Sequence, residues 1–224
     1  MSVAILFAIV VAGLVGWWLF ARQLAVRPWE AQQRSLDDQY EGPVTAFPSA
    51  RVGLRVLLAV ITSFFGLFLS AYSMRMMLAD WAPLTEPGLL WGNTLILILA
   101  SVAFQWTRGM ARDGDAARVK AGLLLSGVLS LAFLAGQFLA WRELSASGEF
   151  VYSSPANAFF YLLTGLHAAH LLGGLAVWGR TSMRVWQGGA SRPGDIRLSI
   201  ELCSVYWHYL LLVWLVLFGL LLTT

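Results

Sequence analysis

The chain reads Glu201-Leu-Cys-Ser-Val-Tyr-Trp-His208-Tyr-Leu-Leu-Leu-Val-Trp214 near its end, and this stretch decides the fold. It places a carboxylate and an imidazole inside an apolar segment that is long enough to span a membrane. Glu201, Ser204 and His208 follow one another at i, i+3 and i+7, so a helix presents them on one face. Ionisable groups at membrane depth are costly and normally face protein or trapped water. We therefore expect this segment to be a helix docked against other helices.

The composition extends this prediction to the whole chain. Of 224 residues, 58% are hydrophobic and only 12% are charged, whereas soluble domains are usually about 25% charged. Apolar runs of membrane-spanning length recur along the sequence, and they are continuous, whereas the strands of a transmembrane barrel alternate. The sequence therefore predicts an all-α, polytopic membrane helix bundle.

We predict six spans, at residues 2–20, 52–78, 88–108, 118–142, 157–180 and 198–222. Residues 1–20 are interpreted as an uncleaved N-terminal anchor, because the stretch has no basic start and no Ala-x-Ala cleavage site. Residues 21–51 are polar and interrupted by prolines, which predicts a cytoplasmic linker on the membrane surface. Residues 52–224 are then a five-helix membrane domain.

The charges of the loops predict the orientation. Basic residues gather at 21–51, 108–120 and 180–197, whereas residues 79–87 and 142–156 are mainly acidic. The positive-inside rule places the basic loops in the cytoplasm and both termini on the periplasmic side. The net charge of +3 is thus a topology signal and does not predict binding to nucleic acid. The predicted uncleaved anchor and the lack of a transit peptide favour a bacterial inner membrane.

Polar side chains recur at helical spacing in the inner spans, and His167 and His170 lie one turn apart. Small residues accompany these polar positions, as is typical of helices that pack closely in membranes. We interpret the polar residues mainly as contacts that hold the bundle together. A buried cluster in which Glu201 bonds to a histidine is one such arrangement, and it would fix the register of the helices.

Metal or haem ligation is the alternative for the histidines. A b-type haem takes two axial ligands from facing helices, and His167 or His170 opposite His208 would be such a pair. Cys203 lies almost opposite His208 around its helix, so a zinc site lacks a ligand set. No phosphate-binding loop or nucleophile elbow occurs. We predict no catalytic residue, metal site or cofactor in this chain, which we expect to work inside a larger complex.

Several motifs resemble subunit III of the haem-copper terminal oxidases. Glu201-x6-His208 with Tyr206-Trp207-His208 is similar to the family's closing helix. The stretch Thr164-Gly165-Leu166-His167-Ala-Ala-His170 resembles its Thr-Gly-x-His-x-x-His helix. Further resemblances occur in chain order at Phe64-Phe65 with Ala71-Tyr72, at Asn93-Thr94-Leu95, and at Gln137 with Trp141.

The sequence departs from the family pattern at the membrane carboxylates. The family's Ser-Glu-x-x-x-Phe stretch corresponds to residues 58–64, which contain no acid. Ala140 and Leu211 stand where other family acids are expected. A proton-delivery role of those carboxylates is therefore not implied here. Members have five or seven helices, so a single extra N-terminal span points to a divergent branch.

The resemblance implies a non-catalytic subunit of a proton-pumping oxidase that reduces O2 to water. Haem and copper are then expected in partner subunits I and II, with subunit I as the main contact and phospholipid as a bound ligand. The residues expected to form a structural or lipid-contacting polar cluster are Asn93, Gln137, His167, His170, Glu201 and His208. The alternatives are the corresponding subunit of a nitric oxide reductase or quinol oxidase, a b-haem membrane electron carrier, and a transporter with a polar site at mid-membrane.

Overall fold

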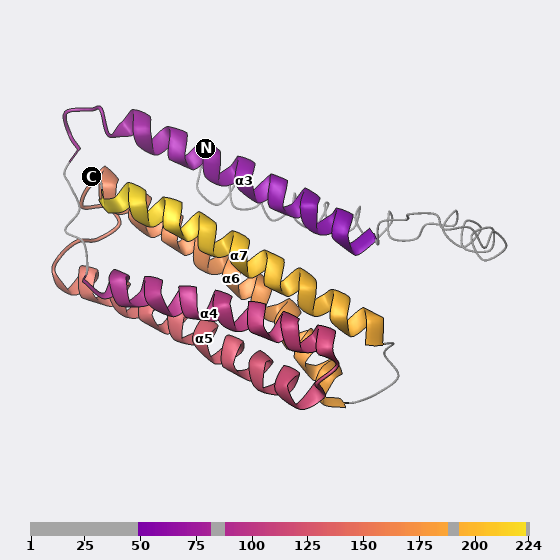
Figure 1. Cartoon of the computed structure of the whole chain (residues 1–224). Coiled ribbons are helices and arrows are strands. Elements are labelled where there is room, and N and C mark those ends of the chain that lie inside the picture. Colours follow the sequence, from indigo (N-terminus) through magenta and orange to yellow (C-terminus); the bar gives the residue numbers. More distant parts are fainter. Residues whose placement is uncertain (1–48, 82–87, 188–192, 223–224) are drawn as a thin grey trace, which may run out of the picture. The chain divides into compact units, whose positions relative to one another are not determined.

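The computed structural model describes residues 49–81, 88–187 and 193–222, and these residues form five long helices (Figure 1). With the labels of Figure 1 they are α3 (Ser49–Arg75), α4 (Leu89–Asp113), α5 (Ala116–Ala146), α6 (Pro155–Gln187) and α7 (Pro193–Leu222). All five are long and apolar enough to cross a membrane. The prediction of an all-α, multi-pass membrane protein is therefore confirmed for this part of the chain. The predicted anchor at 1–20, and the linker up to residue 48, lie outside the described residues.

Three helices extend well beyond their predicted ends. α4 continues from residue 108 to Asp113, α6 from 180 to Gln187, and α7 begins at Pro193, five residues before the expected 198. The predicted ends followed the apolar runs, but a helix continues through polar residues as long as its backbone groups stay bonded. α4 ends only at Gly114, whose positive φ of 79° places it in the left-handed region. Asp115 then caps α5 by accepting from the Arg118 amide at 3.0 Å.

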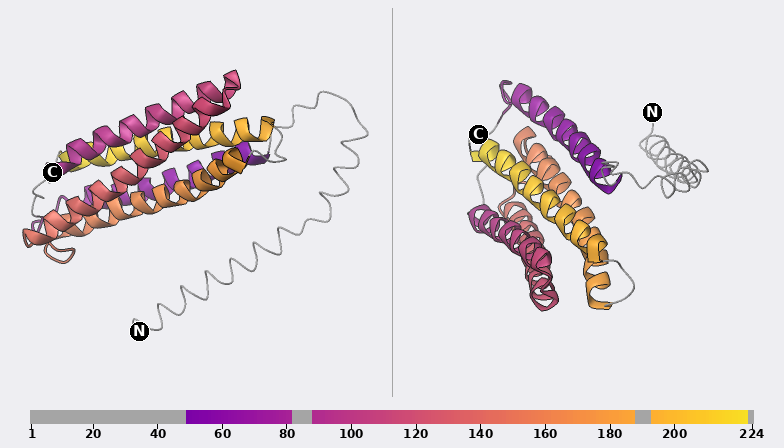
Figure 2. Two further views of the ribbon diagram at one scale, coloured as in Figure 1. Left: turned by 90° about the horizontal axis from the view of Figure 1, so that it is seen from below. Right: turned by 45° about the vertical axis from the view of Figure 1, so that its right-hand side comes forward.

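Four of the helices form a bundle, and α3 lies against one side of it. Figures 1 and 2 show α4 paired with α5 and α6 paired with α7, with α3 beside α6 and α7. Hydrogen bonds from two buried tryptophans and one half-buried tryptophan join the helices. Trp214 donates to Thr94 of α4, Trp207 to Ser130 of α5, and the half-buried Trp141 to Thr164 of α6. Each indole N–H thus has an acceptor inside the bundle, where lipid offers none.

Glycine allows the closest helix contacts. A methyl group at Gly127 of α5 would collide with the ring of Trp178 of α6, and one at Gly122 would collide with Thr107 of α4. The Trp178 ring nitrogen donates to the Leu123 carbonyl at 3.1 Å across this contact. The small residues singled out in the sequence therefore position a tryptophan and a threonine, as expected for membrane helices that approach closely.

The start of α3, the junction of α4 with α5, the end of α6 and the start of α7 lie at one end of the bundle, called here the basic end. At the opposite end lie the end of α3, the turn that follows it and the junction of α5 with α6. There Arg75 donates to Asp80 at 2.6 Å across the turn that follows α3, and this guanidinium lowers the pKa of the Asp80 carboxyl.

Candidate functional site

Glu201 lies near the start of α7, between two arginines from two other helices. Its Oε2 accepts from Arg51 Nη2 of α3 at 3.2 Å, and its Oε1 accepts from Arg108 Nη2 of α4 at 3.1 Å. The carboxylate is only 31% exposed, so it is partly shielded from solvent. We call these three residues the arginine clamp. The structure thus gives Glu201 arginine partners in place of the expected histidine, and the clamp joins α3, α4 and α7 at the basic end.

The same face of α7 continues toward the membrane interior. Ser204 Oγ donates to Gln105 Oε1 of α4 at 3.3 Å, and His208 lies one turn further along. His208 Nδ1 is 2.6 Å from the Ser204 carbonyl of its own helix. A groove of about 460 Å³ between α4 and α7 is lined by Ser101, Gln105 and His208 together with apolar side chains. The prediction that Glu201, Ser204 and His208 share one face is confirmed, and this face is turned toward α4.

Asn93 and Gln137 meet inside the bundle. The Asn93 side-chain amide of α4 donates to Gln137 Oε1 of α5 at 3.3 Å, and both residues are buried. Gly136 has no side chain, which makes room for the Asn93 amide. On the next residue of α4, Thr94 receives the Trp214 indole at 2.9 Å. Hydrogen bonds therefore connect three helices of the bundle at this level.

The two histidines of α6 have different surroundings. His167 is completely buried, and its ring lies 5.2 Å from the ring of Trp214 and 5.8 Å from that of Phe133. No described residue bonds to either of its ring nitrogens. The His170 ring lies 5.6 Å from Phe65 of α3, and its Nδ1 is 2.8 Å from the Leu166 carbonyl. His167 therefore belongs to the bundle interior, whereas His170 faces the junction with α3.

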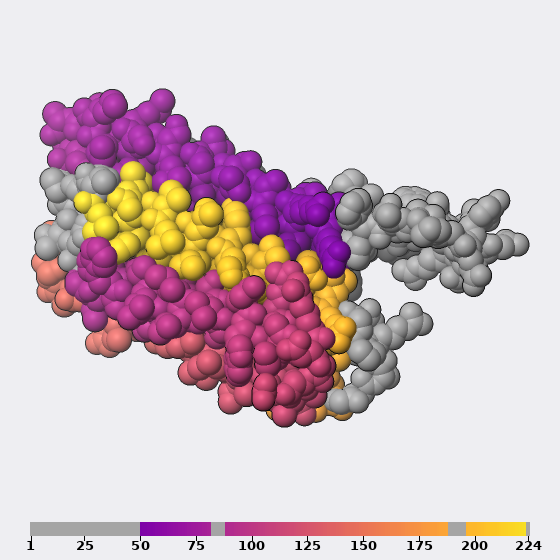
Figure 3. Space-filling model, in the orientation of Figure 1, coloured from indigo at the N-terminus to yellow at the C-terminus, as the bar shows by residue number. Residues whose placement is uncertain are grey.

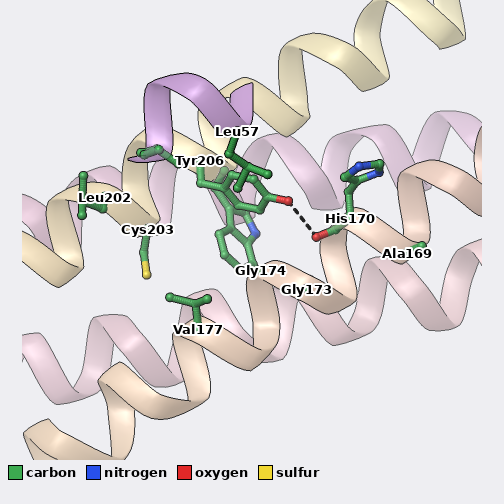
Figure 4. A pocket seen from close by; sticks show the side chains of 11 residues that line it. Leu57, Ala169, His170, Gly173, Gly174, Val177, Leu202, Cys203 and Tyr206 are labelled. Carbon is green, nitrogen blue, oxygen red and sulfur yellow. Dashed lines mark hydrogen bonds between the residues drawn. The ribbon is translucent and has the colours of Figure 1, made fainter. Parts of the chain in front are cut away.

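Beside His170 lies an apolar groove of about 470 Å³ between α3, α6 and α7 (Figure 4). Leu57 comes from α3, Gly173 and Val177 from α6, and Cys203 and Tyr206 from α7. The Tyr206 hydroxyl donates to the His170 carbonyl at 3.0 Å, which keeps the phenol bonded at the wall of the groove. A methyl group at Gly173 would meet no atom within 4 Å, so this glycine opens onto the groove.

The six predicted site residues therefore occupy several places. Asn93 and Gln137 are in contact, whereas Glu201, His208, His167 and His170 each have other neighbours. In the described part of the chain no group of three His, Cys, Asp or Glu residues is arranged to hold a metal ion. A role of the six residues in contacting lipid stays a prediction.

Sequence reasoning missed the clamp arginines. Arg51 precedes an apolar run and Arg108 ends one. From the sequence alone, their positive charge therefore indicates only the topology of the chain. The missed signal is that Glu201, Arg51 and Arg108 all occur at the predicted basic ends of their spans. Opposite charges at one depth in neighbouring helices are expected to pair.

Comparison with known proteins gives one consistent result. The family model for cytochrome c oxidase subunit III matches residues 51–222. A probable cytochrome c oxidase subunit 3 of Mycobacterium tuberculosis (strain ATCC 25618 / H37Rv) is 32% identical over 174 residues, which cover 75% of this chain and 84% of that protein. The cytochrome c oxidase subunit 3 of Synechocystis sp. is 30% identical over 170 residues, which cover 72% of this chain and 70% of that protein.

Proposed function

The chain belongs to the cytochrome c oxidase subunit III family, and on that premise we propose that it is the non-catalytic subunit III of a haem-copper respiratory oxidase. Membership implies a hetero-oligomeric oxidase complex in a membrane. In our proposal the complex reduces O2 to water and pumps protons, with haem and copper held by subunits I and II. The chain packs against subunit I, binds phospholipid, and keeps the enzyme active over many turnovers.

The hydrogen bonds and ion pairs of Glu201, His170 and His208 support this proposal. Glu201 is held by two arginines, and His170 and His208 each lie within hydrogen-bond distance of a carbonyl of their own helix. Both carboxylate oxygens of Glu201 are used between helices, and His170 and His208 each place one ring nitrogen at their own backbone. These contacts support a structural role.

The apolar groove of Figure 4 supports the lipid part of the proposal. Its walls are leucine, valine and aromatic side chains from three helices, and its volume of about 470 Å³ suits an acyl chain. An acyl chain there would cover α3, which has few buried residues of its own and contacts only α6 and α7 among the described helices. Lipid would thus act as a filler that holds α3 against the bundle.

The arrangement of the loops supports the proposed orientation. The structure places the Arg51–Glu201–Arg108 clamp and the α4–α5 junction at one end of the bundle. We propose that this end faces the cytoplasm of a bacterial cell, with both termini of the chain in the periplasm.

The test compares two preparations of the oxidase, one purified from a strain that makes this chain and one from a strain that lacks it. We expect subunits I and II without the chain to keep their haem spectrum and initial rate of O2 consumption. They should lose activity after fewer turnovers than the complete enzyme. Adding the chain back should restore the number of turnovers before inactivation. An equal number of turnovers before inactivation with and without the chain would contradict the proposed stabilising role.

A further inference from the structure

The groove between α4 and α7 exposes polar side chains from two helices that are long and apolar enough to cross a membrane. Gln105 of α4 and His208 of α7 are both exposed, and the other exposed amide of the described spans, Gln187, is the last residue of α6. Both line the same groove. Figure 3 shows α4 and α7 side by side on one face of the bundle, with α7 between α4 and α3.

The hydrogen bonds that His208 and Gln105 make within the chain leave one nitrogen of each side chain without a partner among the described residues. The Ser204 carbonyl can only accept, so in the neutral imidazole of His208 the bonded Nδ1 carries the proton and Nε2 is left as an acceptor. Gln105 uses its oxygen for Ser204, which leaves its amide nitrogen to donate. Ser101 is 2% exposed and lines the groove, and its hydroxyl has no partner among the described residues. The exposed side chains of the groove therefore offer an acceptor and a donor, whereas the Ser101 hydroxyl is buried.

Acyl chains would leave these positions unsatisfied. A polar group without a hydrogen bond in an apolar medium costs several kcal/mol on transfer scales, so such groups in membrane spans normally face protein. The outer face of α5 provides the contrast, because its exposed side chains between residues 121 and 139 are all apolar. Lipid suits that face of α5, and the polar groove between α4 and α7 requires a polar partner.

We propose that the α4–α7 groove seats a transmembrane helix of another subunit of the oxidase. That helix carries, level with His208, a hydroxyl or amide side chain that donates to His208 Nε2 and accepts from Gln105. His208 is seven residues beyond the clamp, which is about 10 Å along the helix axis. A phospholipid headgroup stays near the interface, whereas a helix can present a polar side chain at any depth. Ile98, Val102 and Leu211 supply apolar walls for its packing.

This inference rests on the proposed function, and site-specific photocrosslinking tests it separately. A benzophenone amino acid replaces Val102 in the groove, which is 59% exposed, or Val128 on the apolar face of α5, which is 55% exposed. Crosslinking is performed in native membranes, and the adducts are identified by mass spectrometry of the purified complex. We expect position 102 to form adducts with a named oxidase subunit and position 128 to form adducts with lipid.

Lipid adducts alone at position 102, in a complex that still contains the haem-copper subunits, would overturn the inference and leave the proposed function standing. Failure of the unmodified chain to co-purify with any haem-copper subunit would overturn the proposed function itself.

A second measurement examines the hydrogen bond. His208→Leu removes the acceptor, whereas His208→Gln keeps a hydrogen-bonding group at this position. Because one polar contact between membrane helices contributes about 0.6 kcal/mol, we expect His208→Leu to weaken retention of the chain in the complex about threefold. The His208→Gln variant should keep most of the wild-type retention in the complex. Equal retention of both variants and the wild-type chain in a detergent titration would contradict the proposed contact.

Discussion

At the scale of single residues, Glu201 is the side chain that links the most helices by ion pairs among the described residues. Its two carboxylate oxygens receive guanidinium groups from two other helices, so it connects three helices through two ion pairs. Partial exposure weakens both pairs, since the side chains of Arg51 and Arg108 are 41% and 25% exposed. The clamp therefore sets which helices adjoin more than it adds to the free energy of folding.

Replacing Glu201 with Gln tests the clamp without changing the shape of the side chain. We expect the free energy of unfolding in mixed micelles to fall by about 1 kcal/mol, because partly exposed ion pairs contribute 0.2–1 kcal/mol each. Glu143→Gln is the control, because Glu143 is exposed near the far end of α5. Equal stability of the two variants would show that the clamp does not hold the helices together.

The Arg75–Asp80 pair predicts a pH dependence. In the folded protein the pKa of the Asp80 carboxyl is lowered by Arg75. The stability that the pair contributes is therefore present above the ordinary aspartate pKa and is lost as the pH falls through the lowered value. We expect the difference in melting temperature between wild type and Asp80→Asn to be constant from about pH 8 to 5 and to shrink below about pH 4. A difference that grows on acidification would contradict the pairing.

At the scale of helices, the continuous apolar runs predicted the five described spans because each run had to fill the membrane. Their polar ends were not predictable in this way. Residues 109–113 and 181–187 are polar or mixed, and nothing in their composition separates a helical extension from a loop. Their helicity follows from packing in three dimensions, for example of Thr181 and Val185, which are buried in the bundle.

Close helix contacts give the third prediction. Gly127→Ala places a methyl group where the Trp178 ring lies, so α5 and α6 must separate or the indole must move. Overpacking of this kind typically costs 1–3 kcal/mol, and we expect a loss of about that size in unfolding experiments. Gly179→Ala on α6 is the matched control, because its added methyl group meets no atom within 4 Å. Similar losses in the two variants would contradict the close approach.

The amide pair of α4 and α5 gives the fourth prediction. In a double-mutant cycle of Asn93→Ala and Gln137→Ala, we expect a coupling energy of about 0.6 kcal/mol, the average for hydrogen bonds between membrane helices. A coupling energy of zero would mean that the two side chains act independently.

At the scale of the whole molecule, the sequence predicted the class of protein and most polar positions but not their grouping. Helical spacing placed Glu201, Ser204 and His208 on one face, and the structure confirms this face. Spacing along single helices carries no information on which helices adjoin. For that reason the expected single cluster appears as a clamp at one end, an amide pair in the interior and three histidines in three surroundings.

A reduced-minus-oxidised spectrum, together with mass spectrometry, of the tagged chain purified from its native membrane in mild detergent tests most directly whether the chain is a haem-free subunit of an oxidase. We expect haem-copper subunits to co-purify and the complex to oxidise cytochrome c. When this chain is separated from them, the haem signal should stay with those subunits and be absent from the isolated chain. Oxidation of quinol or reduction of nitric oxide would instead identify a related complex. Haem retained by the isolated chain would contradict the account and make His167, His170 and His208 candidate ligands.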